Sequence, residues 1–165
     1  MYVMKEKLLG VSFSKTPIVK IRVIKEFDPI ALIKNKKQYP FKLTKCVTVR
    51  VATNLRKFSF TIPDGYCWNG ADIPRVLFLL GQSKENHYLI ASMVHDYMLE
   101  YKSVLYNGTL KREISVEQYR RLTTLIFREI LKKHRTNVIK ANVMAGAVDW
   151  FQKWMNRRQW KILKR

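Results

Sequence analysis

Residues 47–62 read VTVRVATNLRKFSFTI, and the fold prediction begins from this stretch. Apolar side chains occupy alternate positions in two runs, Val47, Val49 and Val51 and then Phe58, Phe60 and Ile62. Such alternation is typical of strands with one buried face. Residues 52–54 suit a hairpin turn between the two runs. The stretch therefore predicts an antiparallel sheet with one face on the core and one basic face toward water.

Strand patterns precede this stretch and helical patterns follow it. Residues 19–24 alternate as a further strand, and the glycine- and proline-containing segment 62–74 is typical of a loop. Pro74 suits the first turn of a short helix that ends at Leu80. Apolar spacing of three and four then predicts helices over residues 86–101, 115–134 and 137–155, and Ser115 and Gln118 form a capping box.

The order of these elements predicts an α+β fold, with an N-terminal antiparallel β-sheet followed by a C-terminal bundle of three to four helices. We expect one domain over residues 1–165. It is mainly β in 1–63, loop and helices in 64–155, and a basic tail in 156–165.

Composition limits the class of protein. The chain has 165 residues, 47% apolar and 12% aromatic, which is too apolar for a disordered basic tail. Its apolar runs fall short of the ~20 residues of a transmembrane helix. Residues 1–7 lack signal-peptide features, and Cys46 and Cys67 form no Cys-x-x-Cys pair. We expect a soluble intracellular protein without a transmembrane segment.

Positive charge is the most unusual feature of the chain. There are 32 Lys and Arg against 12 Asp and Glu, a net charge of +20. Residues 1–63 hold 14 basic and 3 acidic side chains, and residues 104–165 hold 15 and 4, so each flank carries +11. Residues 64–103 hold 3 basic and 5 acidic side chains, a net charge of −2. The flanks predict an anionic partner.

Two short motifs lie in or beside the near-neutral segment. The loop Pro63–Arg75 reads PDGYCWNGADIPR, and His95-Asp96-Tyr97 follows it. In order and spacing this pair resembles a mostly phage and prophage family called domain of unknown function 1353. That family's pattern is Pro-x-Gly-aromatic, Asp-Gly-Ala-Ser-Ile-Pro-Arg and His-Asp-Tyr, with a later Ala-Asp-x-x-Phe that corresponds to Thr123-Thr124-x-x-Phe127. The resemblance covers roughly residues 55–155 and implies a phage origin more firmly than any chemistry.

The chain departs from the family pattern at three acid or hydroxyl positions. The family's first Asp is Asn69 here, its Ser is Asp72, and its helical Asp is Thr124. If family members bind a metal through these acids and the His-Asp pair, this chain has lost two anionic positions and gained one.

The His-Asp pair permits two interpretations. In the first, His95, Asp96 and Asp72 are catalytic or metal-binding residues of a hydrolase, with a divalent metal as the only cofactor. In the second, which the substitutions favour, the pair ties the glycine-rich loop to its helix by hydrogen bonds. The structural motif then consists of Gly65, Asn69, Gly70, Asp72, Pro74, Arg75, His95 and Asp96. No phosphate-binding loop or nucleophile motif accompanies it.

Two basic clusters are candidates for polyanion binding. One face of the helix over residues 115–134 and its end carries Arg121, Arg128, Lys132 and Arg135. The tail carries Arg157, Arg158, Trp160, Lys161, Lys164 and Arg165. Basic side chains around an aromatic residue suit phosphate contacts with stacking, and they suit an acidic protein surface almost equally. A solvated helix face is the alternative for the first cluster, although Glu117 is its chief acid.

These observations favour a small phage-encoded accessory or virion-associated protein. Its partner would be nucleic acid or an acidic phage structural protein, in the host cytoplasm or in the virion. The alternative function is a metal-dependent or degenerate hydrolase that uses the His-Asp site. The sequence leaves the oligomeric state open.

Overall fold

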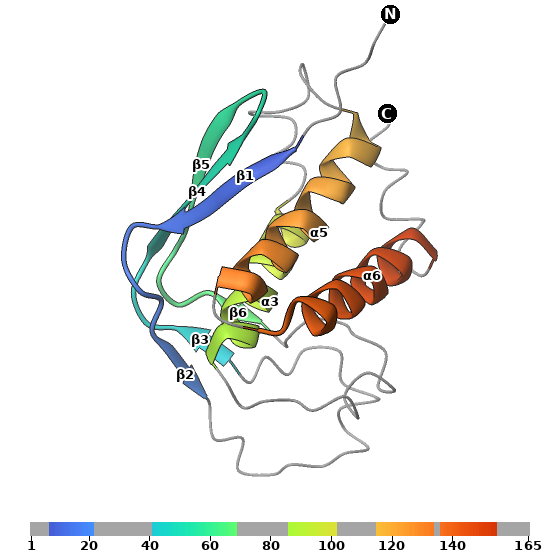
Figure 1. Cartoon of the computed structure of the whole chain (residues 1–165). Coiled ribbons are helices and arrows are strands. Elements are labelled where there is room, and N and C mark those ends of the chain that lie inside the picture. The colour runs from blue at the N-terminus through green and yellow to red at the C-terminus, as the bar shows by residue number, and fades with distance from the viewer. Residues whose placement is uncertain (1–6, 22–40, 69–85, 102–114, 134–135, 155–165) are drawn as a thin grey trace, which may run out of the picture.

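The structure is a computed structural model, and it describes residues 7–21, 41–68, 86–101, 115–133 and 136–154 (Figure 1). Strands β1 (Leu8–Phe13), β4 (Val47–Thr53) and β5 (Lys57–Ile62) form an antiparallel sheet in the order β1-β4-β5, here called sheet A. Strands β2 (Val19–Ile21), β3 (Phe41–Leu43) and β6 (Cys67–Trp68) form sheet B in the order β2-β3-β6. The helices are α3 (Asn86–Glu100), α5 (Val116–Lys133) and α6 (Val138–Trp154).

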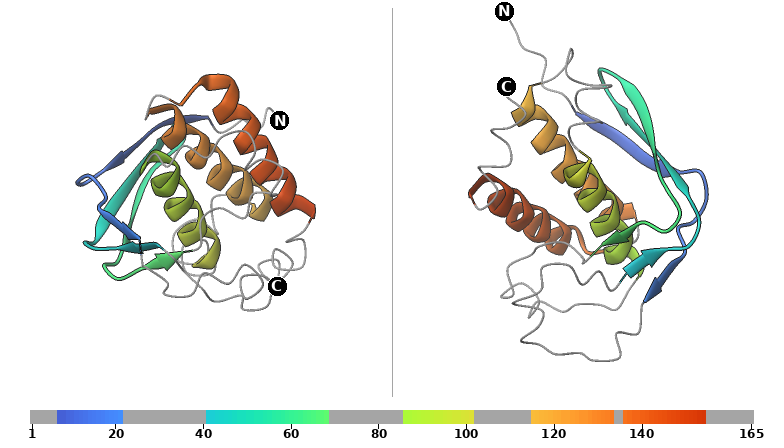
Figure 2. Two further views of the ribbon diagram at one scale, coloured as in Figure 1. Left: turned by 90° about the horizontal axis from the view of Figure 1, so that it is seen from below. Right: turned by 180° about the vertical axis from the view of Figure 1, so that it is seen from behind.

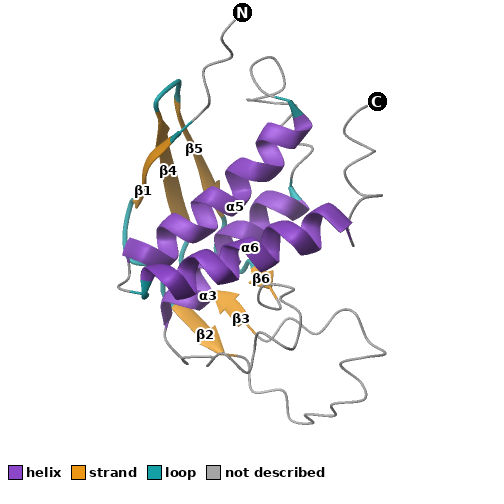
Figure 3. Cartoon of the chain, turned by 45° about the vertical axis from the view of Figure 1, so that its right-hand side comes forward, coloured by secondary structure: helices purple, strands orange, loops and turns teal. Residues whose placement is uncertain are grey.

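The elements are arranged in layers, and the predicted α+β class is confirmed. Figure 2 shows all three helices on one side of sheet A, with α6 on the side of α5 that faces away from the sheet. In Figure 3 the strands of sheet A lie behind the helices. The predicted bundle of three to four helices corresponds to α3, α5 and α6 in the described residues. None of the helices described is both long and apolar enough to cross a bilayer.

The hairpin of β4 and β5 forms as predicted, but its turn lies later than residues 52–54. Val47, Val49 and Val51 are at most 2% exposed, as the alternation requires. Pairing continues to Thr53, whose backbone N–H donates to the carbonyl of Arg56 at 2.8 Å. The Thr53 hydroxyl accepts hydrogen bonds from the backbone N–H groups of Leu55 and Arg56. This threonine-centred turn moves the reversal to residues 54–56.

The strands do not all belong to one sheet. The predicted strand over residues 19–24 is described only as β2, which pairs with β3 in sheet B. The vacant edge of sheet A is taken by β1, a strand that the alternation pattern did not predict. Two adjacent leucines and Gly10 obscure the period of β1, and its register shifts between Leu8 and Gly10. A bulge of this kind breaks the alternation that sequence reading relies on.

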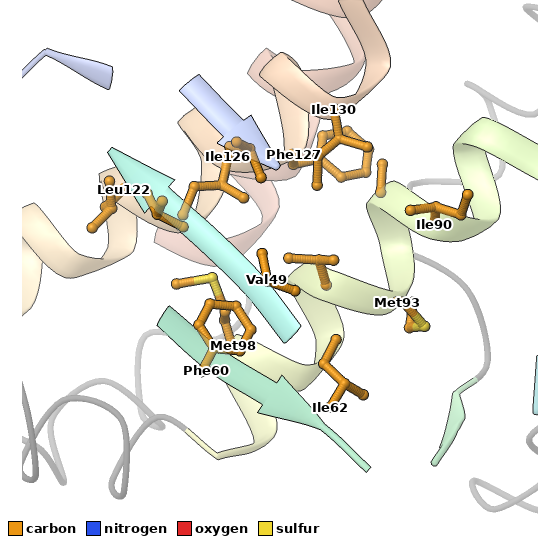
Figure 4. Close-up of a cluster of buried hydrophobic side chains, with 14 of the residues drawn as sticks. Val49, Phe60, Ile62, Ile90, Met93, Met98, Leu122, Ile126, Phe127 and Ile130 are labelled. Carbon is orange, nitrogen blue, oxygen red and sulfur yellow. The ribbon is translucent and has the colours of Figure 1, made fainter. Parts of the chain in front are cut away.

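The core lies between sheet A and the two helices nearest to it. Figure 4 shows side chains from β4 and β5 meeting side chains from α3 and α5. The contributors include Val49, Phe60, Ile62, Ile90, Met93, Met98, Leu122, Ile126, Phe127 and Ile130. Full burial of one such side chain stabilises the fold by about 1.5–3 kcal/mol. Helix α3 is therefore held in place by apolar contacts on several sides.

The predicted capping box opens α5, and a side-chain cap that was not predicted opens α6. The backbone N–H of Ser115 donates to Gln118 Oε1 at 2.7 Å, and the backbone N–H of Gln118 donates to Ser115 Oγ at 3.2 Å. This is the reciprocal capping box that opens α5. At α6, Asn137 Oδ1 accepts from the backbone N–H of Ile139 at 2.8 Å. The short helix predicted over residues 74–80 lies outside the described residues.

Candidate functional site

The first half of the motif loop forms a tight turn beside sheet B. The backbone N–H of Tyr66 donates to the carbonyl of Pro63, and the N–H of Gly65 donates to the carbonyl of Leu43 at 2.9 Å. Gly65 has a φ of +77° at the third position of this turn. A type II turn requires a positive φ there, which glycine adopts without strain. Gly65 therefore has a conformational role in the turn.

Aromatic side chains join this turn to helix α3. The ring of Tyr66 meets the ring of Tyr97 edge-on at 5.1 Å. The hydroxyl of Tyr97 donates to the carbonyl of Thr61 at 3.1 Å, and that of Tyr66 donates to Glu100 Oε2 at 3.0 Å. Trp68 adds a buried hydrogen bond from Nε1 to Ser92 Oγ. The two sequence motifs are thus in direct contact through their tyrosines.

Burial and acids keep these phenols protonated. Burial is the largest cause that raises the pKa of Tyr66 well above its usual value, and the nearby carboxylates of Asp96 and Glu100 raise it further. Burial followed by the neighbouring Tyr101 and Glu100 also raises the pKa of Tyr97. A phenol in this state donates a hydrogen bond and does not act as a base. The tyrosines therefore serve as positioned donors.

His95 lies inside the helical layer. Its side chain is 4% exposed, and its Nδ1 lies 3.4 Å from Asp96 Oδ1. Its Nε2 forms a short hydrogen bond with the side-chain amide of Gln152 on α6. The ring also meets the ring of Phe127 on α5 at 5.6 Å. His95 therefore connects α3 to both other helices.

This arrangement favours the structural interpretation of the His-Asp pair. Both imidazole nitrogens face protein partners, so neither nitrogen is directed toward a metal or a substrate in this conformation. The described residues contain no cluster of three or more His, Cys, Asp or Glu side chains that could hold a metal ion. The remaining motif residues, Asn69, Gly70, Asp72, Pro74 and Arg75, lie outside the described residues, so whether they approach His95 stays a prediction.

Gln152 is the partner that sequence reading missed. It is 1% exposed and follows Ala141, Ala145 and Val148 along the buried face of α6 at helical spacing. A glutamine at the end of an apolar helix face was the available signal. The two threonines at the family's Ala-Asp position are also satisfied within the protein. The hydroxyls of Thr123 and Thr124 both donate to the carbonyl of Arg120.

If His95 is structural, its removal will lower stability and metal will have no effect. We expect His95→Ala to lower the free energy of unfolding by about 1–3 kcal/mol, because the Gln152 amide loses its buried partner. Gln152→Ala should cost a similar amount, and the double variant less than the sum of the two. Zinc or manganese added to metal-free protein should leave the wild-type melting temperature unchanged. A metal-dependent rise that His95→Ala abolishes would contradict the structural role.

Only part of the predicted basic stripe on α5 is exposed for contact with a polyanion. Arg121 is 64% exposed, and its Nε donates to Glu117 Oε1 at 3.2 Å. Arg128 and Lys132 are half-buried, and within the described part of the chain the buried Nε of Arg128 has no hydrogen-bond partner. Arg135 and all six tail residues, Arg157, Arg158, Trp160, Lys161, Lys164 and Arg165, lie outside the described residues. Their role as polyanion contacts stays a prediction.

A buried arginine next to this stripe was not predicted. Arg120 is 4% exposed and donates to both carboxylate oxygens of Glu117, through Nε at 3.0 Å and Nη2 at 2.8 Å. Its Nη1 donates to Asp149 Oδ1 on α6 at 2.5 Å. The available signal was Glu117 three residues earlier in the helix. The fork of Arg120 joins α5 to α6 and occupies two of the helical acids.

The outer face of sheet A is the other basic surface. It carries outward-pointing residues of three strands, Gly10, Ser12, Thr48, Arg50, Ala52, Lys57, Ser59 and Thr61. Residues 7–18 and 41–62 contain no Asp or Glu, while Arg50 and Lys57 are both exposed on this face. The helices lie on the opposite side of the sheet (Figure 2). The face is therefore basic, as the strand pattern predicted.

A family model described as "Protein of unknown function (DUF1353)" matches residues 42–148. The chain belongs to this family. The match begins in β3 and ends in α6, so it includes the whole β4–β5 hairpin and extends further toward the N-terminus than the motifs alone implied. Comparison with curated proteins gives no match, and neither does comparison with solved structures.

Within this DUF1353 chain, the described family motif residues make two sets of contacts with one another. The Pro63–Tyr66 turn packs on Tyr97, while His95 and Phe127 touch in the helical layer. The motifs thus coincide with the contacts that join sheet, loop and helices. The basic outer face of sheet A lies on the far side of that sheet from the helices.

Proposed function

We propose that this DUF1353 protein is a phage-encoded accessory or virion-associated protein that binds a polyanion, with nucleic acid as the favoured partner. The observation that carries the proposal is the outer face of sheet A, where Arg50 and Lys57 are exposed and none of the described residues is an acid. The phage setting rests on the sequence resemblance described above, and the polyanion rests on charge.

The uneven distribution of acids between the layers supports this proposal. Two acids of α5 and α6, Glu117 and Asp149, form ion pairs with Arg120. The strands and turns of residues 7–18 and 41–62 carry seven basic side chains and no acid. A surface patch of one sign attracts ligands of the opposite sign and speeds their association. The sheet layer is the better polyanion surface among the described residues, because the α5 stripe includes an arginine paired with Glu117.

The hydrolase alternative receives less support. Its central histidine is buried and contacts protein groups through both ring nitrogens, so neither nitrogen is placed to bind a metal in this conformation. A binding role needs only exposed cations, and the outer face supplies them.

Salt dependence of binding tests the proposal. We expect the protein to bind labelled oligonucleotides in fluorescence anisotropy measurements, and the affinity to fall on the order of 10²–10³-fold between 50 and 200 mM salt if about four to five phosphates are contacted. The cause is release of counterions from the neutralised phosphates. Affinity that does not change with salt, or no binding at low salt, would contradict the proposal. Equal binding to polyglutamate would instead favour the acidic-protein partner.

A further inference from the structure

A shallow hollow lies on the outer face of sheet A. Its volume is about 450 Å³, and it is lined by residues from all three strands. The outward-pointing residues among them are Gly10, Ser12, Arg50, Ala52, Lys57 and Ser59. None of the family motifs described above contributes to it, although Arg50 and Lys57 lie within the matched residues, and it was not among the sites predicted from the sequence.

Strand register explains the shape of the hollow. One row across the sheet pairs Ser12 with Arg50 and Arg50 with Ser59. The next outward row pairs Gly10 with Ala52 and Ala52 with Lys57. Each row therefore holds one long cation and two small side chains. The small residues form the floor, and the two cations rise above it from adjacent strands.

The chemistry of the lining suits phosphate. Arg50 offers a planar fork of N–H donors, Lys57 offers an ammonium group, and the hydroxyls of Ser12 and Ser59 are exposed. A guanidinium group matches the oxygen geometry of a phosphate, and a lysine adds a point charge. Within the described residues, neither Arg50 nor Lys57 has an ion pair with an acid. Both side chains are exposed, so an anion from solution can reach them.

The two cations are placed to meet different phosphates. Arg50 and Lys57 are diagonal neighbours on paired strands, which places their backbones about 7–8 Å apart. That separation is comparable to the distance between successive phosphates along an extended nucleic-acid strand. The small floor residues let a backbone approach closely. Together with the phosphate-binding chemistry of the guanidinium and ammonium groups, this spacing suits two successive phosphates of one strand.

We propose that this hollow binds the phosphodiester backbone of a nucleic-acid strand, through Arg50 and Lys57 with hydroxyl contacts from Ser12 and Ser59. This inference rests on the proposed function and names the surface that performs it. Because the contacts are to phosphates and not to base edges, binding is independent of base sequence.

A matched pair of double variants tests the inference. Arg50→Gln with Lys57→Gln removes two charges from the hollow, and Lys15→Gln with Lys45→Gln removes two exposed charges from turns that do not line it. We expect the first variant to weaken oligonucleotide binding roughly tenfold or more and to lower the slope of log affinity against log salt by about 2. The second should have less than half of either effect. Thermal melting curves of both variants provide the control that each is folded.

A third variant separates the effect of the hollow's shape on binding from the effect of its charge. Ala52→Leu leaves every charge in place but fills the floor between Arg50 and Lys57, so we expect severalfold weaker binding with an unchanged melting temperature. Oligonucleotides of different base sequence should bind the wild-type protein equally.

The outcomes distinguish the inference from the proposed function. If the wild type binds in a salt-dependent way and the two double variants lose equal affinity, the hollow is not the binding site, while the proposed polyanion function stands. Binding that depends on base sequence, or that Ala52→Leu leaves unchanged, would also overturn it. Absence of salt-dependent binding in the wild type would overturn both.

Discussion

Replacing Phe127 with alanine is expected to lower the free energy of unfolding by about 3–5 kcal/mol, the largest effect of any single substitution considered. The side chain is fully buried on α5. Its ring meets Tyr88 at 6.4 Å and His95 at 5.6 Å, both edge-on. Truncation removes these contacts and leaves a cavity between helices that are fixed by other contacts. Urea unfolding of the wild type and the variant measures the difference.

An exposed apolar residue provides the control for this prediction. Ile139 on α6 is 74% exposed, so Ile139→Ala should change stability by no more than about 0.5 kcal/mol. If Phe127→Ala costs as little as Ile139→Ala, the packing of α5 against α3 described above is wrong. The family's aromatic position in Ala-Asp-x-x-Phe would then need another role than the packing of the core.

Replacing Arg120 with methionine is expected to lower the free energy of unfolding by about 2–3 kcal/mol. This is somewhat less than the loss on breaking a fully buried ion pair, because both acids keep contact with water. Methionine fills a similar volume but cannot donate to Glu117 or Asp149. Their side chains are 51% and 37% exposed. Arg120→Lys is the control that keeps the charge, and it should recover only part of the loss because an ammonium group lacks the fork. A loss equal to that of Arg121→Met would contradict the role of Arg120.

The same interaction makes stability depend on pH. The hydrogen bond from Arg120 is the largest cause that lowers the pKa of Glu117, from 4.5 to about 2. Because the unfolded state binds the proton more tightly, this contribution is present above pH 4.5 and is lost as the pH falls toward 2. In Arg120→Met that acid-side loss should shrink. Urea unfolding at a series of acidic pH values measures it.

Local pattern was sufficient to predict much of the secondary structure. The alternation in residues 47–62 predicts β4 and β5, and apolar spacing with the Ser115 capping box predicts the three helices within one or two residues. These features depend on neighbours in the chain, whose period of two or 3.6 places apolar groups on one face. Strand β1 was missed because a bulge and a glycine interrupt that period.

The candidate sites were less predictable because their partners are far apart in sequence. His95 was identified from its motif, but Gln152 lies 57 residues away and meets it only because α3, α5 and α6 pack together. Arg120 lies beside the predicted basic stripe, yet packing against Asp149, 29 residues away, makes it an internal tie. Helical spacing alone predicts a face and does not say which face a neighbouring helix will cover.

The distribution of charge shows the same difference between what the sequence determines and what the tertiary structure determines. The amino-acid sequence is enough to establish a net charge of +20, an acid-free run over residues 41–62 and one basic residue at an outward position of each of the two strands predicted in that run. Only the tertiary structure decides that β1 supplies Gly10 and Ser12 beside Arg50 and Lys57, which creates a hollow between cations. The reason is physical: a residue's type and spacing are local properties, whereas strand register and helix packing are set by contacts between distant segments that bury apolar surface together.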